Sequence, residues 1–244
     1  MMTNSTPDML ETTVSVNRSH MVGRPLQAFL AIPSGPGLYP GVVIIHEILG
    51  LNDNIRDIAR RFVQEGYAAL AVDLFSTASR VICMARVFHG MLLRPLQNGV
   101  VGDLQAALDF LGARPEVDRA RLGAIGFCMG GSYALQLACV SRGPRAASVF
   151  YGMNPRPLEA VTRACPIAGS YPERDFTANA ARRLEPILEQ ARVAHDIKIY
   201  PGARHSFFND KGPTYHAAAA HDAWQRTLAF FNTHLQNTTP DMGI

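Results

Sequence analysis

The residue whose surroundings most clearly indicate chemistry is Cys128, in the run Gly126-Phe127-Cys128-Met129-Gly130. An apolar segment precedes it and a segment of helical period follows, which predicts a tight strand-turn-helix with the cysteine at its tip. Such a turn aims the side chain at the positive end of the helix, where the thiolate is favoured, and places the Met129 N–H to stabilise an oxyanion. The alternative is that Cys128 is a small buried apolar residue, as free cysteines often are.

A cysteine nucleophile needs a base, and His205 follows the last predicted strand, residues 196–200. Ligand sites in doubly wound sheets form at the carboxyl ends of the strands, so this position favours His205 as the base. Asp175 lies between the two in the chain order nucleophile, acid, histidine, and is the expected orienting acid. Glu173 is the alternative acid, two residues earlier.

Glu47 follows the predicted strand 41–46, at the position where such folds place the second oxyanion donor. That donor would be the backbone N–H of Ile48. The alternative is that Glu47 caps the next helix or faces water. Ser132 and Ser206 adjoin the motifs, but neither occupies the tip of the turn, so we expect both to form structural hydrogen bonds.

The elements that must position these residues alternate along the chain. Short runs rich in Val, Ile, Ala and Phe alternate with segments of helical period, which predicts a single domain with a mostly parallel, doubly wound sheet and helices on both faces. Together with the sharp turn at Cys128, this pattern predicts an α/β-hydrolase fold. The expected strands are 28–32, 41–46, 68–73, 122–127, 146–151, 166–169 and 196–200; the expected helices are 54–65, 102–111, 131–140, 177–191 and 216–235. Residues 76–101 are the least interpretable, and we expect an excursion of helices over the site.

Composition excludes several classes of protein. The 244 residues are 48% hydrophobic and 18% charged, which predicts one packed domain over residues 1–244, with a disordered polar start at residues 1–8. The net charge of +3 is small and the basic residues are scattered, so neither a nucleic acid nor a membrane is an expected partner. No secretory signal or long apolar run is apparent, and we expect a cytoplasmic protein.

The cysteines do not form a metal or redox motif. Cys83, Cys128, Cys139 and Cys165 have neither C-x-x-C spacing nor the paired spacing of zinc ligands. We therefore expect no metal site.

Taken together, these motifs resemble the dienelactone hydrolases, also called carboxymethylenebutenolidases, from about Ala28 to His234. The resemblance is carried by His46-Glu47-Ile48-Leu49-Gly50-Leu51, by residues 66–74, by the turn at 126–131 and by residues 201–207. It implies a hydrolase that opens a lactone or small carboxylic ester and uses no cofactor. A monomer or small homo-oligomer is expected.

The resemblance also implies roles for particular residues. It implies a Cys128–His205–Asp175 triad, a thioester acyl-enzyme, and a Glu47 carboxylate that holds the resting thiol until substrate enters. Members of the family bind a substrate carboxylate through an arginine shortly after the catalytic histidine, where this chain has Asn209. Further candidates for substrate binding are Arg80, Arg86, Arg94 and Tyr151.

Two other classes of protein remain as alternatives. A non-catalytic α/β-hydrolase fold could serve as a small-molecule binding or sensing protein, although such proteins usually lack one triad member. A redox-responsive thiol protein is the other alternative, since a cysteine beside a base can also act as a sensor. Cys83 or Cys165 would then have to approach Cys128 in the fold.

Overall fold

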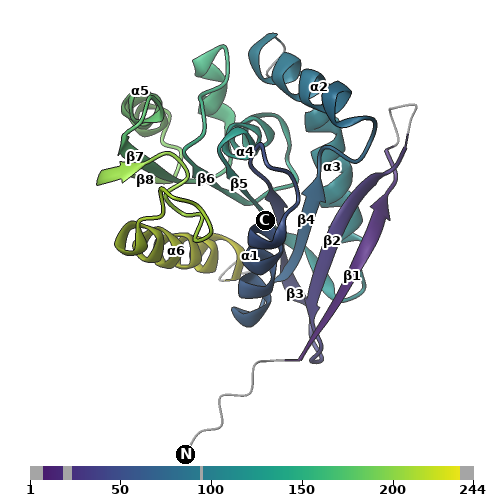
Figure 1. The fold of residues 1–244 in the computed structure, drawn as a ribbon. Helices are drawn as coiled ribbons and strands as arrows, with labels where there is room; N and C mark the ends of the chain where they lie inside the picture. Colours follow the sequence, from purple (N-terminus) through teal and green to yellow (C-terminus); the bar gives the residue numbers. More distant parts are fainter. Residues whose placement is uncertain (1–7, 19–23, 94–95, 237–244) are drawn as a thin grey trace, which may run out of the picture.

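One eight-stranded sheet organises the chain, in a computed structural model that describes residues 8–18, 24–93 and 96–236 (Figure 1). The strands lie in the order β1-β2-β4-β3-β5-β6-β7-β8. Only β2 runs against its neighbours; the other pairs are parallel. The strands are β1 Met9–Val16, β2 Leu26–Pro33, β3 Tyr39–Ile45, β4 Ala68–Asp73, β5 Val117–Phe127, β6 Ala146–Phe150, β7 Ile167–Arg174 and β8 His195–Arg204.

Helices cover both faces of the sheet because the central strands are apolar on both sides. In β3, Val42 and Ile44 pack in one core cluster, whereas Val43 and Ile45 pack in the cluster on the opposite face. Such continuous apolar runs are typical of parallel strands buried on both faces. The helices are α1 Asp53–Gln64, α2 Arg80–Leu93, α3 Gly99–Gly112, α4 Met129–Val140, α5 Thr177–Gln190 and α6 Ala217–Phe231, with short turns η1 Leu158–Arg163 and η2 Asn232–Gln236.

The two layers of helices have different partners. Phe62 of α1 contacts Trp224 and Phe231 of α6, with ring centroids 4.7 and 6.1 Å apart, and these rings form the centre of one layer. Leu104 of α3 and Tyr133 of α4 belong to the core on the other face. Figure 1 shows α1 in front of the sheet and α3 behind it. The fold is therefore the doubly wound α/β architecture that the sequence predicts.

The strands β7 and β8 extend about four to five residues beyond their predicted carboxyl ends. Residues 171–174, which lie beyond the predicted strand 166–169, continue β7 and pair with β8 as far as Arg174 and Arg204. The extension of β7 could not be predicted from the sequence, because Pro172 cannot donate a hydrogen bond within a sheet. The pairing register also shifts between Pro172 and Arg174. As a result, β7 ends directly before Asp175 and β8 ends directly before His205.

The segment 76–101 contains helix α2 and the start of α3, as expected for a helical excursion. Arg94 lies outside the described residues, as does most of the N-terminal segment predicted to be disordered. Asp8, the last residue of that segment, accepts a hydrogen bond from the Ser34 N–H at 2.9 Å. Within the described ranges, no helix is long and apolar enough to cross a membrane.

Candidate active site

Cys128 occupies a strained position between β5 and α4. Its φ of 56° and ψ of −118° are unusual for a residue with a side chain. The backbone is fixed on both sides: the Cys128 N–H donates to Phe150 O at 3.1 Å, and Cys128 O accepts from the Ser132 N–H at 3.1 Å. The turn therefore holds the cysteine at its tip, as the motif predicts.

Close backbone approach explains the glycines around Cys128. A Cβ on Gly126 would lie 2.0 Å from Gly130 O, and a Cβ on Gly130 would lie 2.3 Å from Ile45 O. Neither distance is possible for a real side chain. Glycine at both positions allows α4 to begin directly against β5 and β3.

His205 and Asp175 meet beyond the ends of β8 and β7. His205 Nδ1 lies 2.7 Å from Asp175 Oδ2. The carboxylate also accepts hydrogen bonds from the Phe176 N–H at 2.8 Å and the Thr177 hydroxyl at 2.5 Å. Glu173, the alternative acid, instead accepts from the Gly202 N–H at 2.9 Å. Asp175 is thus the acid that the fold brings to the histidine.

His205 connects Asp175 to Cys128. Burial alone would lower the pKa of His205, but its hydrogen bonds to Cys128 and Asp175, with the charges of both, raise that pKa to about 9. Both partners therefore favour the protonated form of the imidazole. The ring of Phe176 stacks on His205, with centroids 5.7 Å apart and an interplanar angle of 15°.

Glu47 is buried beside the same group of residues. The Tyr151 hydroxyl donates to Glu47 Oε1 at 2.8 Å. Burial, followed by the charge of Glu47 and this hydrogen bond, raises the pKa of Tyr151 well above its usual range, and the charge of Cys128 adds to the effect. The phenol therefore remains protonated and remains a donor. Tyr151, like Cys128, has a positive φ, of 42°.

The loop that carries Glu47 is held by His46. Its Nε2 accepts from the Leu74 N–H at 3.0 Å, which leaves Nδ1 to donate to Glu47 O at 2.6 Å. Arg80 supports the same loop from α2, because its guanidinium donates to Ile48 O at 3.2 Å and to Leu49 O at 3.4 Å. The loop is thus fixed from two sides.

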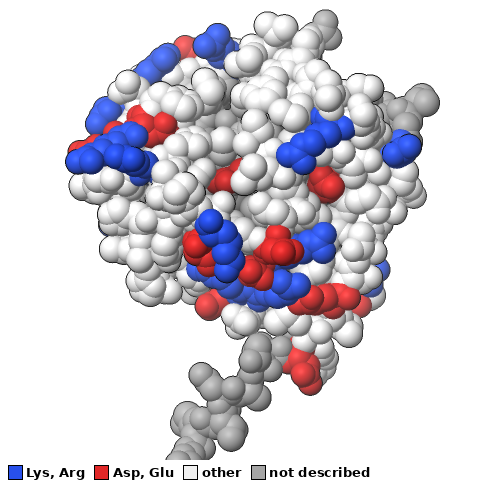
Figure 2. Space-filling view, viewed as in Figure 1, with Lys and Arg blue, Asp and Glu red and all other residues white. Residues whose placement is uncertain are grey.

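A cavity of about 220 Å³ opens above Cys128. Its walls come from the loop after β3, from α2, from the start of α4, and from the segments after β6 and β7. They consist of Ile48, Phe88, Met91, Cys128, Met129, Ser132, Tyr151, Met153, Phe176 and His205. Figure 2 shows the surface between α5 and α2 as largely free of charged side chains. No Lys or Arg among the described residues lines this cavity.

The two residues that are predicted to supply oxyanion donors lie at this cavity. Ile48 and Met129 both line it. In the part of the chain that the structure describes, neither of their backbone N–H groups has a hydrogen-bond partner. Both donors are therefore available to a ligand.

The structure places the remaining substrate-binding candidates elsewhere, apart from Tyr151. Arg80 binds the loop carbonyls described above. Arg86 forms an ion pair with the buried Asp103 at 2.8 Å, and Arg18 binds the other oxygen of that carboxylate at 2.5 Å. Asn209 is buried and accepts from the Lys211 N–H at 3.0 Å. None of these side chains lines the cavity above Cys128.

Several residues of the cavity were missed by reasoning from the sequence. Phe88 and Met91 lie on α2, whose path over the site no local pattern reveals. Met153 follows β6, again without a motif. Phe176 was also missed, although its position directly after Asp175 could have identified it.

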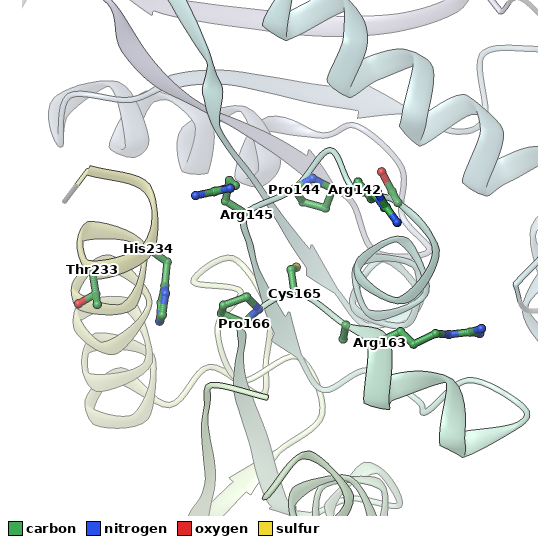
Figure 3. Close-up of a pocket in the computed structure, with 10 residues that line it drawn as sticks. Arg142, Pro144, Arg145, Arg163, Cys165, Pro166, Thr233 and His234 are labelled. Carbon is green, nitrogen blue, oxygen red and sulfur yellow. The ribbon is translucent and has the colours of Figure 1, made fainter. Parts of the chain in front are cut away.

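A larger hollow, of about 500 Å³, lies at the opposite end of the strands (Figure 3). It is formed where β6 and β7 begin, and Arg145 and Pro166 are the residues just before those strands. In Figure 3 the side chains of Arg142, Arg145 and Arg163 point in different directions and do not converge. Among the described residues, no cluster of His, Cys, Asp and Glu could hold a metal ion.

Comparison with known proteins identifies the family of this chain. Residues 26–235 match the sequence model of the "Dienelactone hydrolase family". A "Putative carboxymethylenebutenolidase" of Saccharolobus solfataricus is 36% identical over 248 aligned positions, which cover 85% of this chain and 94% of that protein.

Two solved structures share the fold. A "Putative Dienelactone Hydrolase" from Klebsiella pneumoniae is 28% identical with a TM-score of 0.80, covering 92% of this chain and 98% of its own. A dienelactone hydrolase-like promiscuous phosphotriesterase from metagenomic libraries is 25% identical with a TM-score of 0.80, covering 93% and 98%. The chain belongs to the dienelactone hydrolase family and is an ester or lactone hydrolase.

Proposed function

We propose that this hydrolase uses Cys128 as its nucleophile and opens a lactone or carboxylic ester through a thioester acyl-enzyme. The observation that carries the proposal is the contact between His205 and Asp175 at 2.7 Å, together with the position of His205 and Cys128 on the wall of one cavity. Nucleophile, base and orienting acid follow β5, β8 and β7, so all three stand at the carboxyl edge of the sheet.

The reaction uses each of these groups in turn. Cys128 Sγ bonds to the carbonyl carbon, and His205 holds the thiol proton. The carbonyl oxygen becomes negative and accepts hydrogen bonds from the Ile48 and Met129 N–H groups. The bond from carbon to the ester oxygen then breaks, and His205 gives its proton to that oxygen. In a lactone, the new hydroxyl stays attached to the acyl group.

Hydrolysis of the thioester completes the cycle. A water molecule attacks the acyl carbon while neutral His205 accepts its proton. Acylation converts the Cys128 sulfur into a thioester and so removes its contribution to the raised pKa of His205, the largest of the contributions that raise it. His205 is therefore a neutral base more often in the acyl-enzyme than in the free enzyme. No step requires a cofactor.

Glu47 is proposed to hold the resting thiol. Both Glu47 and Cys128 affect the pKa of Tyr151, which indicates that both groups lie near its phenol. Tyr151 occupies Oε1 of Glu47, and in the described residues nothing occupies Oε2, which leaves this oxygen to accept from the thiol. A thiol held in this way is protected from oxidation until substrate displaces it.

The lining of the cavity indicates the charge of the reacting part of the substrate. Apart from the catalytic groups and Ser132, the lining side chains are apolar or aromatic, and none is Lys or Arg. A carboxylate placed against these walls would lose its hydration without gaining a strong partner. The group that reacts at Cys128 is therefore proposed to be uncharged.

Replacement of Cys128 tests the proposal. Cys128→Ala should abolish turnover of 4-nitrophenyl acetate without loss of folding, whereas Cys165→Ala, at the far end of the sheet, should keep it. Intact-protein mass spectrometry of the quenched wild-type reaction should show an acetyl group on Cys128. Full activity of Cys128→Ala, or an acetyl group on Ser132, would overturn the assignment of the nucleophile.

A further inference from the structure

A second hollow adjoins the catalytic cavity. It has a volume of about 460 Å³ and lies between the segment that follows β6 and helix α5. Met153 and Phe176 line both this hollow and the cavity above Cys128, so these two side chains form a shared wall. We call the second hollow the arginine groove, after Arg156 and Arg183, which line it.

The charge of the arginine groove differs from that of the cavity. Arg156 and Arg183 are both exposed, and within the described ranges neither guanidinium forms an ion pair. No Asp or Glu lines the groove. Figure 2 shows basic side chains over α5 and over the neighbouring segment that carries η1. The guanidinium groups of Arg156 and Arg183 therefore lie without an ion-pair partner beside a cavity that no Lys or Arg lines.

Asn154 supplies the groove with a further polar group. Its side-chain amide nitrogen donates to Ala180 O at 2.9 Å, which fixes the side chain against α5. Its Oδ1 is buried and has no hydrogen-bond partner among the described residues. Asn154 therefore holds the segment after β6 against α5 beside the two arginines.

We propose that the arginine groove binds a carboxylate at the far end of the substrate's acyl chain, while the ester group at the other end reacts at Cys128. An apolar spacer would run along Met153 and Phe176, which are shared by both spaces. Arginine suits this role because its planar guanidinium binds a carboxylate through two parallel hydrogen bonds. The substrate class is then the monoester of a long dicarboxylic acid.

This inference rests on the proposed hydrolysis at Cys128, and it resolves the conflict between an uncharged cavity and the neighbouring cations. The anion and the reacting carbonyl occupy different spaces. Charge recognition should therefore depend on the length of the spacer, because a short acyl chain cannot place its carboxylate beside the arginines while its ester reaches Cys128.

A pair of substrates of equal chain length tests the proposal. We would compare mono-4-nitrophenyl suberate, which ends in a carboxylate, with 4-nitrophenyl octanoate, which ends in a methyl group. For the doubly substituted Arg156→Gln/Arg183→Gln enzyme, kcat/KM should fall about tenfold with suberate, mainly through KM, as two exposed charge pairs predict. With octanoate, the change should be less than about twofold.

Arg182→Gln is the matched control. Arg182 lies next to Arg183 on α5, is exposed, and donates to Asn179 Oδ1 at 3.0 Å, but it does not line the groove. This variant should leave the ratio of suberate to octanoate turnover unchanged. An equal loss with both substrates in the double variant, or equal effects of Arg182→Gln and Arg183→Gln on that ratio, would overturn the proposal.

Direct binding separates this inference from the hydrolase mechanism. Failure of the wild-type enzyme to hydrolyse octanoate would count against the reaction at Cys128 and would say nothing of the groove. Calorimetric titration of monomethyl suberate into Cys128→Ala then tests the groove alone. Binding should weaken about tenfold when Arg156 and Arg183 are also replaced; unchanged binding would refute the carboxylate site.

Discussion

The Tyr151 hydroxyl donates a hydrogen bond of 2.8 Å to Glu47 Oε1, and both side chains are buried beside Cys128. Tyr151→Phe removes this donor while keeping the ring. The buried carboxylate then loses a partner, and we expect the free energy of unfolding to fall by about 1–3 kcal/mol. Urea denaturation of the variant against wild type measures this change.

Glu47→Gln is the companion variant, because its side-chain oxygen can still accept from Tyr151. We expect a smaller loss of stability than in Tyr151→Phe but faster labelling of Cys128 by iodoacetamide, since the carboxylate no longer holds the thiol. Wild-type labelling rates in Glu47→Gln would count against a gating role for Glu47.

His205 should titrate at an unusually high pH. The pKa of His205 is raised to about 9 by Cys128 and Asp175, so Asp175→Asn or Cys128→Ala should each lower it toward the usual value for histidine. NMR titration of the His205 ring signals in the three proteins measures the shift. A histidine that titrates near its ordinary value in the wild-type protein would show that the hydrogen bonds do not stabilise the imidazolium.

The same shift predicts how stability depends on pH. Because the folded-state pKa is raised, the stabilisation from His205 is present in full below its unfolded pKa and is lost as the pH rises through about 9. Asp175→Asn should therefore destabilise the protein more at about pH 6 than at about pH 10. Melting temperatures at the two values, against wild type, provide the comparison.

Thr177 contacts Asp175, the proposed orienting acid. Its hydroxyl donates to the same oxygen of Asp175 that His205 contacts, at 2.5 Å. Thr177→Val removes this donor at nearly constant volume, and we expect kcat/KM to fall about threefold to tenfold, the equivalent of one hydrogen bond. Thr177→Ser, which keeps the hydroxyl, should restore most of the activity; equal losses in both variants would indicate a packing effect instead.

Arg86 should contribute to stability and not to substrate binding. It shares the buried carboxylate of Asp103 with Arg18, away from the catalytic cavity. Asp103→Asn leaves buried guanidinium charge without its partner, and we expect a loss of about 3–5 kcal/mol in the free energy of unfolding. Arg86→Met should lower the melting temperature while KM for neutral esters stays at the wild-type value. A large rise in KM would return Arg86 to the substrate site.

The glycine at the start of the sharp turn offers a matched comparison. Gly126→Ala would place a Cβ 2.0 Å from Gly130 O and should prevent correct folding or abolish activity. Gly102, on α3, has open space around the same position, so Gly102→Ala should stabilise the protein by about 0.5–1 kcal/mol. Circular dichroism melts of both variants check the contrast.

Much of the fold could be predicted from the sequence because the central strands carry an unambiguous signal. Residues 41–45 and 68–73 are buried on both faces, so apolar character alone predicts them. The ends of β7 and β8 carry polar residues together with Pro172 and Gly202. Their pairing depends on the neighbouring strand. Such pairing is a tertiary property that no local pattern contains.

The candidate site also contains some residues that could be predicted from the sequence and others that could not. Cys128, Asp175 and His205 could be proposed from chain order, since the topology of a parallel sheet brings the carboxyl ends of its strands together. The walls of the cavity could not, because Phe88 and Met91 reach it only through the way in which α2 lies across the sheet. Likewise, the ion pair of Arg86 with Asp103 joins α2 to α3 and has no sequence signature.

The first strand runs parallel to β4, although both flank the opposed strand β2. Met9 therefore enters the sheet at the edge opposite the one that carries Cys128 and His205. A linker joined directly to Met9 would begin on the side of the molecule away from Cys128, so a bead or electrode attached there would leave the entrance of the cavity toward the solution. Immobilisation through this end should preserve access for substrates as long as suberate monoesters.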